Sequence, residues 1–323
     1  MRIHPLYRLA ALAMAIAAAS TLHAVDRPAS APVAATAASA DYAANPAETF
    51  NVGTLKVQRY GDHGTPLILI PGLGSGAWVW KDTVEALRKN HVVYAVTLAG
   101  FDGVPVPAGS GSLFDRADDS LAQLIRGHKI GKPVLVGHSL GGTLALRFAG
   151  EHADLISGVV AVEGLPLFPG MDRVPEAQRL AMARGMREKI EGGTPEAFKA
   201  SQVAYMQKIG VIDPAAALRY GALNGRSDPK AVAEYMAEDL SADLRAGLKG
   251  ANVPILEISP YNAPDSASGP MAMTEAQKTA YYGSLLATAP NARVVPISPA
   301  RHFAMLDQPE KFRQVLTDFI DRI

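Results

Sequence analysis

Ser139 is the first residue in this sequence whose type and surroundings could do chemistry. The segment GHSLG places it after the apolar run PVLV and before the helical pattern LGGTLALRF. A sharp turn from a strand into a helix pushes a hydroxyl at this position out of the sheet, and glycines at 137 and 141 avoid the collisions that a Cβ would cause. A tight glycine turn around an incidental serine would look similar, but the strand before it and the helix after it favour a nucleophile.

A serine hydroxyl is a weak nucleophile unless a base removes its proton. Among the eight histidines of the chain, His302 follows the last apolar run in VVPISPARHFAM and precedes the final helical pattern. A loop at the carboxyl end of that strand can reach the serine, because ligands bind at this edge of an open α/β sheet. His138 adjoins Ser139, but neighbouring side chains on such a turn point apart. Ser139 and His302 together predict acyl transfer to water.

Short apolar runs that alternate with amphipathic helical patterns must position these residues. Several runs are continuously apolar, as parallel strands covered on both faces should be. Their alternation with helices predicts a doubly wound α/β sheet. The expected strands are TLKVQRYG, PLILIPG, HVVYAVTLAG, KPVLVGHS, ISGVVAVEG, VPILEIS and ARVVPIS.

The rhythm of strands and helices changes after the strand ISGVVAVEG. Residues 165–250 carry helical patterns and no convincing strand. We therefore expect a helical cap over residues 165–250, inserted into an α/β core formed by residues 49–164 and 251–323.

The N-terminal segment has the pattern of an export signal. Arg2 and Arg8 precede the apolar run LAALAMAIAAA, and the small-residue exit STLHA predicts cleavage near Ala24. The run has about half the length of a membrane-spanning helix, and no cysteine follows it for lipid attachment. Residues 25–48 are rich in alanine and proline and indicate a flexible linker. We expect a periplasmic or secreted protein without a stable membrane anchor.

Composition narrows the possible partners. The chain has 323 residues, of which 48% are apolar and 19% charged, and its formal net charge is zero. Zero net charge gives no long-range attraction to nucleic acid. With no cysteine, the chain has no thiol nucleophile and no cysteine metal site. We expect a small-molecule acyl substrate, no cofactor, no metal and no nucleic-acid partner, while composition leaves the oligomeric state open.

From residue 50 to the end, the chain resembles the α/β-hydrolase superfamily. In the family's strand numbering, the resemblance is carried by the elbow GHSLGG, the loop PGLGSG after the third strand, TLAGFDG after the fourth, and RHFAMLDQPE, which is similar to the family's His-x4-acid-x-Pro pattern. Pro71-Gly72 stands where the family usually has His-Gly, and Thr97 where it has aspartate. Neither departure removes a catalytic group. The resemblance implies an α/β-hydrolase fold and a secreted serine hydrolase with a Ser-His-acid triad.

Two carboxylates compete for the role of the acid that orients His302. Family enzymes usually carry aspartate after the seventh strand, in a Gly-x-x-Asp turn, where this chain has Pro260 and Ala263. Asp265 follows two residues later. The other known location follows the sixth strand, where VVAVEGLP places Glu163; this resembles the haloalkane dehalogenases that use a glutamate there, although their nucleophile is aspartate. Glu163 is the first choice, because VVAVEGLP places its carboxylate directly at a strand end. Asp265 is the alternative, and only the geometry of the folded chain can decide between them.

Negative charge develops on the carbonyl oxygen when a serine attacks it, and backbone N–H groups must stabilise that charge. Such donors come from the residue after the nucleophile and from the loop after the third strand. Here they are Leu140 and Leu73. Glycines on both sides of Leu73 allow the loop to approach the substrate closely.

The substrate pocket is expected between the cap and the sheet. Trp78 follows the oxyanion loop, His138 adjoins the nucleophile, and Met182 and Met206 lie in the cap. Methionine side chains adapt to irregular apolar shapes. The same tryptophan and methionines could equally fill the core between the cap helices and the sheet.

Together these residues predict hydrolysis of a carboxylic ester or a related acyl bond through an acyl-enzyme. A serine at the elbow argues against epoxide or haloalkane hydrolysis, for which the relatives use aspartate. An aminopeptidase-like amidase and a lactonase would use the same parts and remain alternatives. A non-catalytic binding module on a hydrolase scaffold is the second class, because a fold alone does not fix function.

Overall fold

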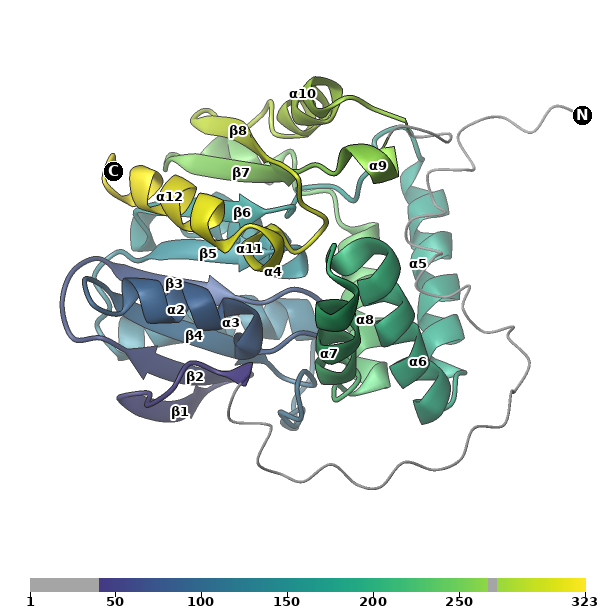
Figure 1. The fold of residues 1–323 in the computed structure, drawn as a ribbon, viewed down its shortest axis with the longest axis horizontal. Coiled ribbons are helices and arrows are strands. Elements are labelled where there is room, and N and C mark those ends of the chain that lie inside the picture. Colours follow the sequence, from purple (N-terminus) through teal and green to yellow (C-terminus); the bar gives the residue numbers. More distant parts are fainter. Residues whose placement is uncertain (1–40, 267–271) are drawn as a thin grey trace, which may run out of the picture.

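The computed structural model describes residues 41–266 and 272–323 and forms one eight-stranded sheet with helices on both faces (Figure 1). The strand order is β1-β2-β4-β3-β5-β6-β7-β8. Strands β1, β2 and β4 pair antiparallel, and all pairs from β4 to β8 are parallel. The doubly wound sheet predicted from the sequence is therefore confirmed. The strands are β1 (Glu48–Val52), β2 (Leu55–Tyr60), β3 (Pro66–Ile70), β4 (Val92–Leu98), β5 (Val134–His138), β6 (Gly158–Val162), β7 (Ile255–Pro260) and β8 (Ala292–Ile297).

Successive strand residues face opposite sides of the sheet, so each face builds its own core. Ile68 and Leu135 pack with α3 (Leu113–Gly127) and α4 (Leu140–Glu151). Leu69 and Val136 pack with α2 (Lys81–Leu87) and α12 (Pro309–Ile320). Burial on both faces explains why the central strands are continuously apolar.

Four helices lie between β6 and β7, where the sequence predicts the cap. They are α5 (Glu176–Glu191), α6 (Pro195–Tyr205), α7 (Pro214–Asn224) and α8 (Pro229–Ser241), with a π-helical turn, η6 (Met206–Gly210), between α6 and α7. Figure 1 shows them grouped at the end of the sheet where the parallel strands terminate. The starts of α6, α7 and α8 are encoded locally, because Thr194, Asp213 and Asp228 each cap an N-terminus whose first residue is proline.

Short elements complete the connections between the larger ones. Helix α10 packs on β7 and β8 near the edge of the sheet. The remaining elements are η4 (Ala77–Trp80), η5 (Ala153–Leu155), η7 (Gly247–Gly250), α9 (Ala263–Ser266), α10 (Glu275–Leu285) and α11 (Ala304–Asp307).

The N-terminal boundary of the fold differs from the sequence expectation. Strand β1 begins at Glu48, and residues before it, expected to belong to the linker, pack against the domain. The Tyr42 hydroxyl donates to Asp102 and accepts from Arg226 at 3.0 Å, and Ala43 is buried. These contacts place Tyr42 and Ala43 with the folded domain.

The expected signal peptide and most of the linker lie outside the described residues. Across residues 41–266 and 272–323, no helix combines the length and the apolar character needed to span a membrane.

Candidate active site

Ser139 occupies a strained turn between β5 and α4. Its φ is 51° and its ψ is −121°, in a region that residues with a side chain rarely adopt. A Cβ on Gly137 would lie 2.1 Å from the Gly141 carbonyl oxygen, and a Cβ on Gly141 would lie 2.5 Å from that of Ile70. These contacts explain why both positions are glycine.

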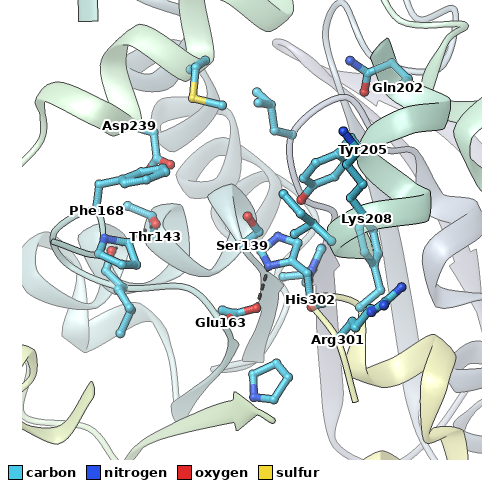
Figure 2. Close-up of a pocket in the computed structure, with 18 of the residues that line it drawn as sticks. Ser139, Thr143, Glu163, Phe168, Gln202, Tyr205, Lys208, Asp239, Arg301 and His302 are labelled. Atoms are coloured by element: carbon cyan, nitrogen blue, oxygen red, sulfur yellow. Dashed lines mark hydrogen bonds and ion pairs between the residues drawn. The ribbon is translucent and has the colours of Figure 1, made fainter. Parts of the chain in front are cut away.

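His302 is fixed by contacts from three directions. Its backbone N–H donates to the Ile209 carbonyl at 3.2 Å, and its own carbonyl lies 3.0 Å from Nε2 of His138. Its Nδ1 lies 2.6 Å from Oε2 of Glu163. Figure 2 shows the His302 ring beside the Ser139 side chain. With Nδ1 bonded to the carboxylate, Nε2 is the nitrogen that remains for the serine.

His138 does not behave as a second base. Its side chain is completely buried, and burial holds its pKa well below the usual range. A carbonyl oxygen only accepts hydrogen bonds, so Nε2 of neutral His138 must donate to the His302 carbonyl. His138 therefore positions the loop that carries His302.

Glu163 follows β6 directly, next to the end of β5. The Ser139 N–H donates to the Val162 carbonyl at 2.9 Å, so the two strand ends are in register. While Oε2 of Glu163 faces His302, Oε1 accepts from Lys278 Nζ and from the Tyr282 hydroxyl, both at 2.6 Å. Lys278 and Tyr282 are four residues apart on α10 and share one helix face.

The charges around Glu163 keep it ionised. Burial alone would raise its pKa, but the Lys278 ammonium and His302 outweigh burial and hold the pKa well below the ordinary value. The Tyr282 hydroxyl stays protonated, because burial and the neighbouring carboxylate raise its pKa well above the usual range. Glu163 is therefore a carboxylate anion whose Oε2 faces the His302 imidazole and whose Oε1 accepts hydrogen bonds from Lys278 and Tyr282.

Asp265, the alternative acid of the sequence analysis, lies in the short helix α9 and is bound elsewhere. Its two oxygens accept from Arg301 at 2.7 and 2.9 Å, in a bidentate pair. Asn262 donates to it at 2.6 Å. The Arg301 guanidinium lowers the pKa of Asp265. The structure brings Glu163, and not Asp265, to the His302 ring.

The loop after β3 lies against Ser139. A Cβ on Gly72 would be 3.2 Å from Ser139 Cβ, so the segment carrying Leu73 passes close to the serine. Leu140 is the first residue of α4, where backbone N–H groups have no partner within the helix. Both expected oxyanion donors therefore belong to segments that meet at Ser139.

The cap holds this loop from the other side. Ser75 donates to the buried Asn224 side chain at 2.9 Å, and Ser227 donates to the Gly74 carbonyl at 2.7 Å. Because Asn224 and Ser227 lie at the end of α7 and just after it, the position of the cap is coupled to the loop that carries Leu73.

A cavity of about 420 Å³ opens over Ser139, a size typical of small-molecule sites. The cap, the sheet end and the His302 loop all contribute to its wall. The residues that line it include Leu73, Ser139, Thr143, Phe168, Met236 and Asp239.

Three of the four expected pocket residues lie elsewhere among the described residues. Trp78 is buried and stacks on Tyr220 of α7, with ring centroids 5.1 Å apart. Met206 is completely buried in the core on the α2 and α12 face, and Met182 packs within the cluster between α5 and α8. Only His138 borders the cavity. The cap methionine that lines the cavity is Met236, because helix register decides which side chain faces inward.

The chain belongs to the alpha/beta hydrolase family, whose family profile matches residues 67–315. Together with the fold, this makes the protein a hydrolase.

Relatives within this family include esterases. The chain is 28% identical over 272 residues to the pimeloyl-[acyl-carrier protein] methyl ester esterase of Aeromonas hydrophila, covering 83% of this chain and 99% of that protein. Among solved structures, a thermophilic esterase from Thermogutta terrifontis has a TM-score of 0.68 at 20% identity, covering 85% of this chain and 98% of that one. The enol-lactonase from Burkholderia xenovorans has a TM-score of 0.62 at 22% identity, covering 85% and 100%. At these sequence identities, the similarity to the solved structures supports the fold alone.

Proposed function

We propose that the protein is a serine esterase that cleaves carboxylic esters through an acyl-enzyme. One observation carries the proposal: Ser139 stands on a strained elbow beside His302, whose Nδ1 lies 2.6 Å from the ionised Glu163 (Figure 2). This arrangement supports the proposed roles of Ser139 as nucleophile, His302 as base and Glu163 as orienting acid.

In the proposed reaction, the Ser139 oxygen attacks the ester carbonyl while Nε2 of His302 accepts the hydroxyl proton. Glu163 stabilises the resulting imidazolium. The carbonyl oxygen becomes an oxyanion and accepts hydrogen bonds from the backbone N–H groups of Leu73 and Leu140. Collapse of this intermediate breaks the ester bond, and His302 gives its proton to the departing alcohol. Water then repeats the sequence on the acyl-enzyme and releases the acid.

The named activities of the relatives support ester substrates. The Aeromonas hydrophila relative is an esterase and is matched along almost its full length. The cavity lies directly over Ser139 and includes apolar side chains such as Phe168 and Met236, which suits the acyl part of an ester.

Hydrolysis of p-nitrophenyl butyrate tests the proposal directly. Purified protein should release nitrophenol at a rate proportional to enzyme, and Ser139→Ala should lose this turnover while keeping its circular dichroism and melting temperature. Residual catalysis above the water rate is expected, because the oxyanion donors remain. Undiminished turnover by Ser139→Ala would reject the mechanism, and aminoacyl anilides and lactones in the same assay compare the amidase and lactonase alternatives.

We further propose that the chain is exported and that its substrate is met outside the cytoplasm. The support is the signal pattern of residues 1–24, with its basic start, apolar run and small-residue exit.

A further inference from the structure

Asp239 of α8 lines the same cavity as the nucleophile, and the proposed ester hydrolysis does not use it. Thr143 connects the two positions. The Thr143 N–H donates to the Ser139 carbonyl at 2.9 Å, one turn along α4, and the Asp239 side chain lies within hydrogen-bonding reach of Thr143. Thr143 therefore links the Asp239 side chain to the Ser139 backbone.

Thr143 is uncharged, so its contact does not balance the negative charge of Asp239. Burial raises the pKa of Asp239 to about 6, so the group is mostly ionised at neutral pH in a site that penalises its charge.

The other two carboxylates bordering the cavity already have cations. Glu163 contacts Lys278 at 2.6 Å, and Asp265 contacts Arg301 at 2.7 Å. Within the part of the chain that the structure describes, Asp239 forms no such ion pair. In Figure 2, Lys208 lies on the opposite side of Ser139 from Asp239.

An aromatic ring accompanies the carboxylate. Phe168 lines the same cavity as Asp239, and in Figure 2 both are drawn on the same side of Ser139. A carboxylate beside an aromatic ring is the combination that attracts an alkylammonium group, through charge and through the electron-rich ring face.

We propose that Asp239, with Phe168, binds an ammonium group of the substrate in the cavity that opens over Ser139. The preferred substrates are accordingly carboxylic esters that carry a basic nitrogen at the far end of a short chain. This inference rests on the proposed esterase function and names its substrate class.

A pair of isosteric esters tests this inference. Methyl 6-aminohexanoate and methyl heptanoate differ by an ammonium in place of a methyl group, and acid release by the full-length protein can be followed by titration at pH 7.5. We expect kcat/KM for the amino ester to exceed that for the neutral ester by tenfold or more. Asp239→Asn should remove this preference by lowering kcat/KM for the amino ester alone, and the neutral ester then shows that the variant is folded and active.

Asp265→Asn is the matched control. It also removes a carboxylate from the cavity wall, but one that Arg301 already balances, so the preference for the amino ester should persist. A measurement on the wild type alone supplements the variants: pentylammonium should inhibit hydrolysis of the neutral ester competitively and at least tenfold more strongly than pentanol.

The two proposals fail in different ways. Two results would overturn the ammonium site and leave the proposed esterase function unaffected. The first is hydrolysis of methyl heptanoate by the wild type without a preference for the amino ester. The second is an equal loss of kcat/KM for both esters in Asp239→Asn. Equal inhibition by pentylammonium and pentanol has the same consequence. Failure of the wild type to hydrolyse either ester or p-nitrophenyl butyrate overturns both proposals.

Discussion

The Lys278 ammonium lies 2.6 Å from Oε1 of Glu163, on the side of the carboxylate that faces away from His302. The same ammonium donates to the Pro260 carbonyl at 2.6 Å. Lys278 therefore ties helix α10 to the end of β7 and stabilises the negative charge that the imidazole needs. A carboxylate this buried would otherwise favour its protonated form.

Replacing Lys278 by methionine should lower kcat about tenfold or more at neutral pH and should shift the acidic limb of the pH–rate profile upward. Without the ammonium, burial raises the pKa of Glu163, so the ionised form is lost at a higher pH as the pH falls. The profile of kcat between pH 5 and 9 measures this shift. Lys89→Met, at an exposed position on the surface, is the matched control and should leave the profile in place. An unshifted profile in Lys278→Met would show that the ammonium does not tune Glu163.

Glu163→Gln and Asp265→Asn separate the two carboxylates. The first change removes the charge that orients and stabilises the His302 ring, and we expect a loss of about three to four orders of magnitude in kcat. The second removes half of an ion pair with Arg301 that lies away from the imidazole and should cost less than tenfold. Steady-state kinetics of both variants on one nitrophenyl ester give the comparison, and a reversed order would assign the acid to Asp265.

Much of this site could be predicted because its signals are local. The turn at Ser139 needs glycines within two residues of it. Glu163 directly follows β6 and His302 lies in the loop after β8, and apolar runs reveal both strands. The partners of Glu163 could not be predicted, because Lys278 and Tyr282 lie 115 and 119 residues away along the chain.

Two physical causes explain what could not be predicted. Strand β1 is an edge strand whose side chains are mostly exposed, so it has no apolar run. Trp78 in η4 and Met206 in the cap are apolar, but whether each faces the cavity or the core depends on how the cap helices pack on the sheet. Asp239 was missed for the same reason, since helix periodicity alone does not show which face meets the nucleophile.

Glu257, on β7, makes the stability of the protein depend on pH. Its carboxyl is buried without a hydrogen-bond partner among the described residues, and burial together with the Glu163 charge raises its pKa well above the ordinary value. A raised folded-state pKa contributes stability that is complete below the unfolded pKa of about 4.3 and is lost as pH rises toward the folded one.

Glu257→Gln is neutral at every pH and should therefore lack this dependence. The melting temperature of the wild type minus that of Glu257→Gln should fall steadily between pH 5 and pH 9. Glu310→Gln, at an exposed position, provides the same charge change as a control. A difference that stays constant over this range would mean that Glu257 keeps the same charge state in the folded and unfolded chains.

Export predicts a defined mature N-terminus. N-terminal sequencing or intact mass of protein recovered from the periplasm or medium of the native host should place the first residue near Val25. Recovery of exported protein that still begins at Met1 would contradict cleavage.

Covalent labelling of Ser139 is the most direct test of the central claim that this serine is the activated nucleophile. A fluorophosphonate transfers its phosphonyl group to a serine oxygen only where a base and an oxyanion site activate that oxygen. After incubation, peptide mass spectrometry should find one phosphonyl group, on Ser139, and Ser139→Ala and heat-unfolded wild type should remain unmodified. A folded, unlabelled wild-type protein, or a label on another residue that persists in Ser139→Ala, would contradict the account.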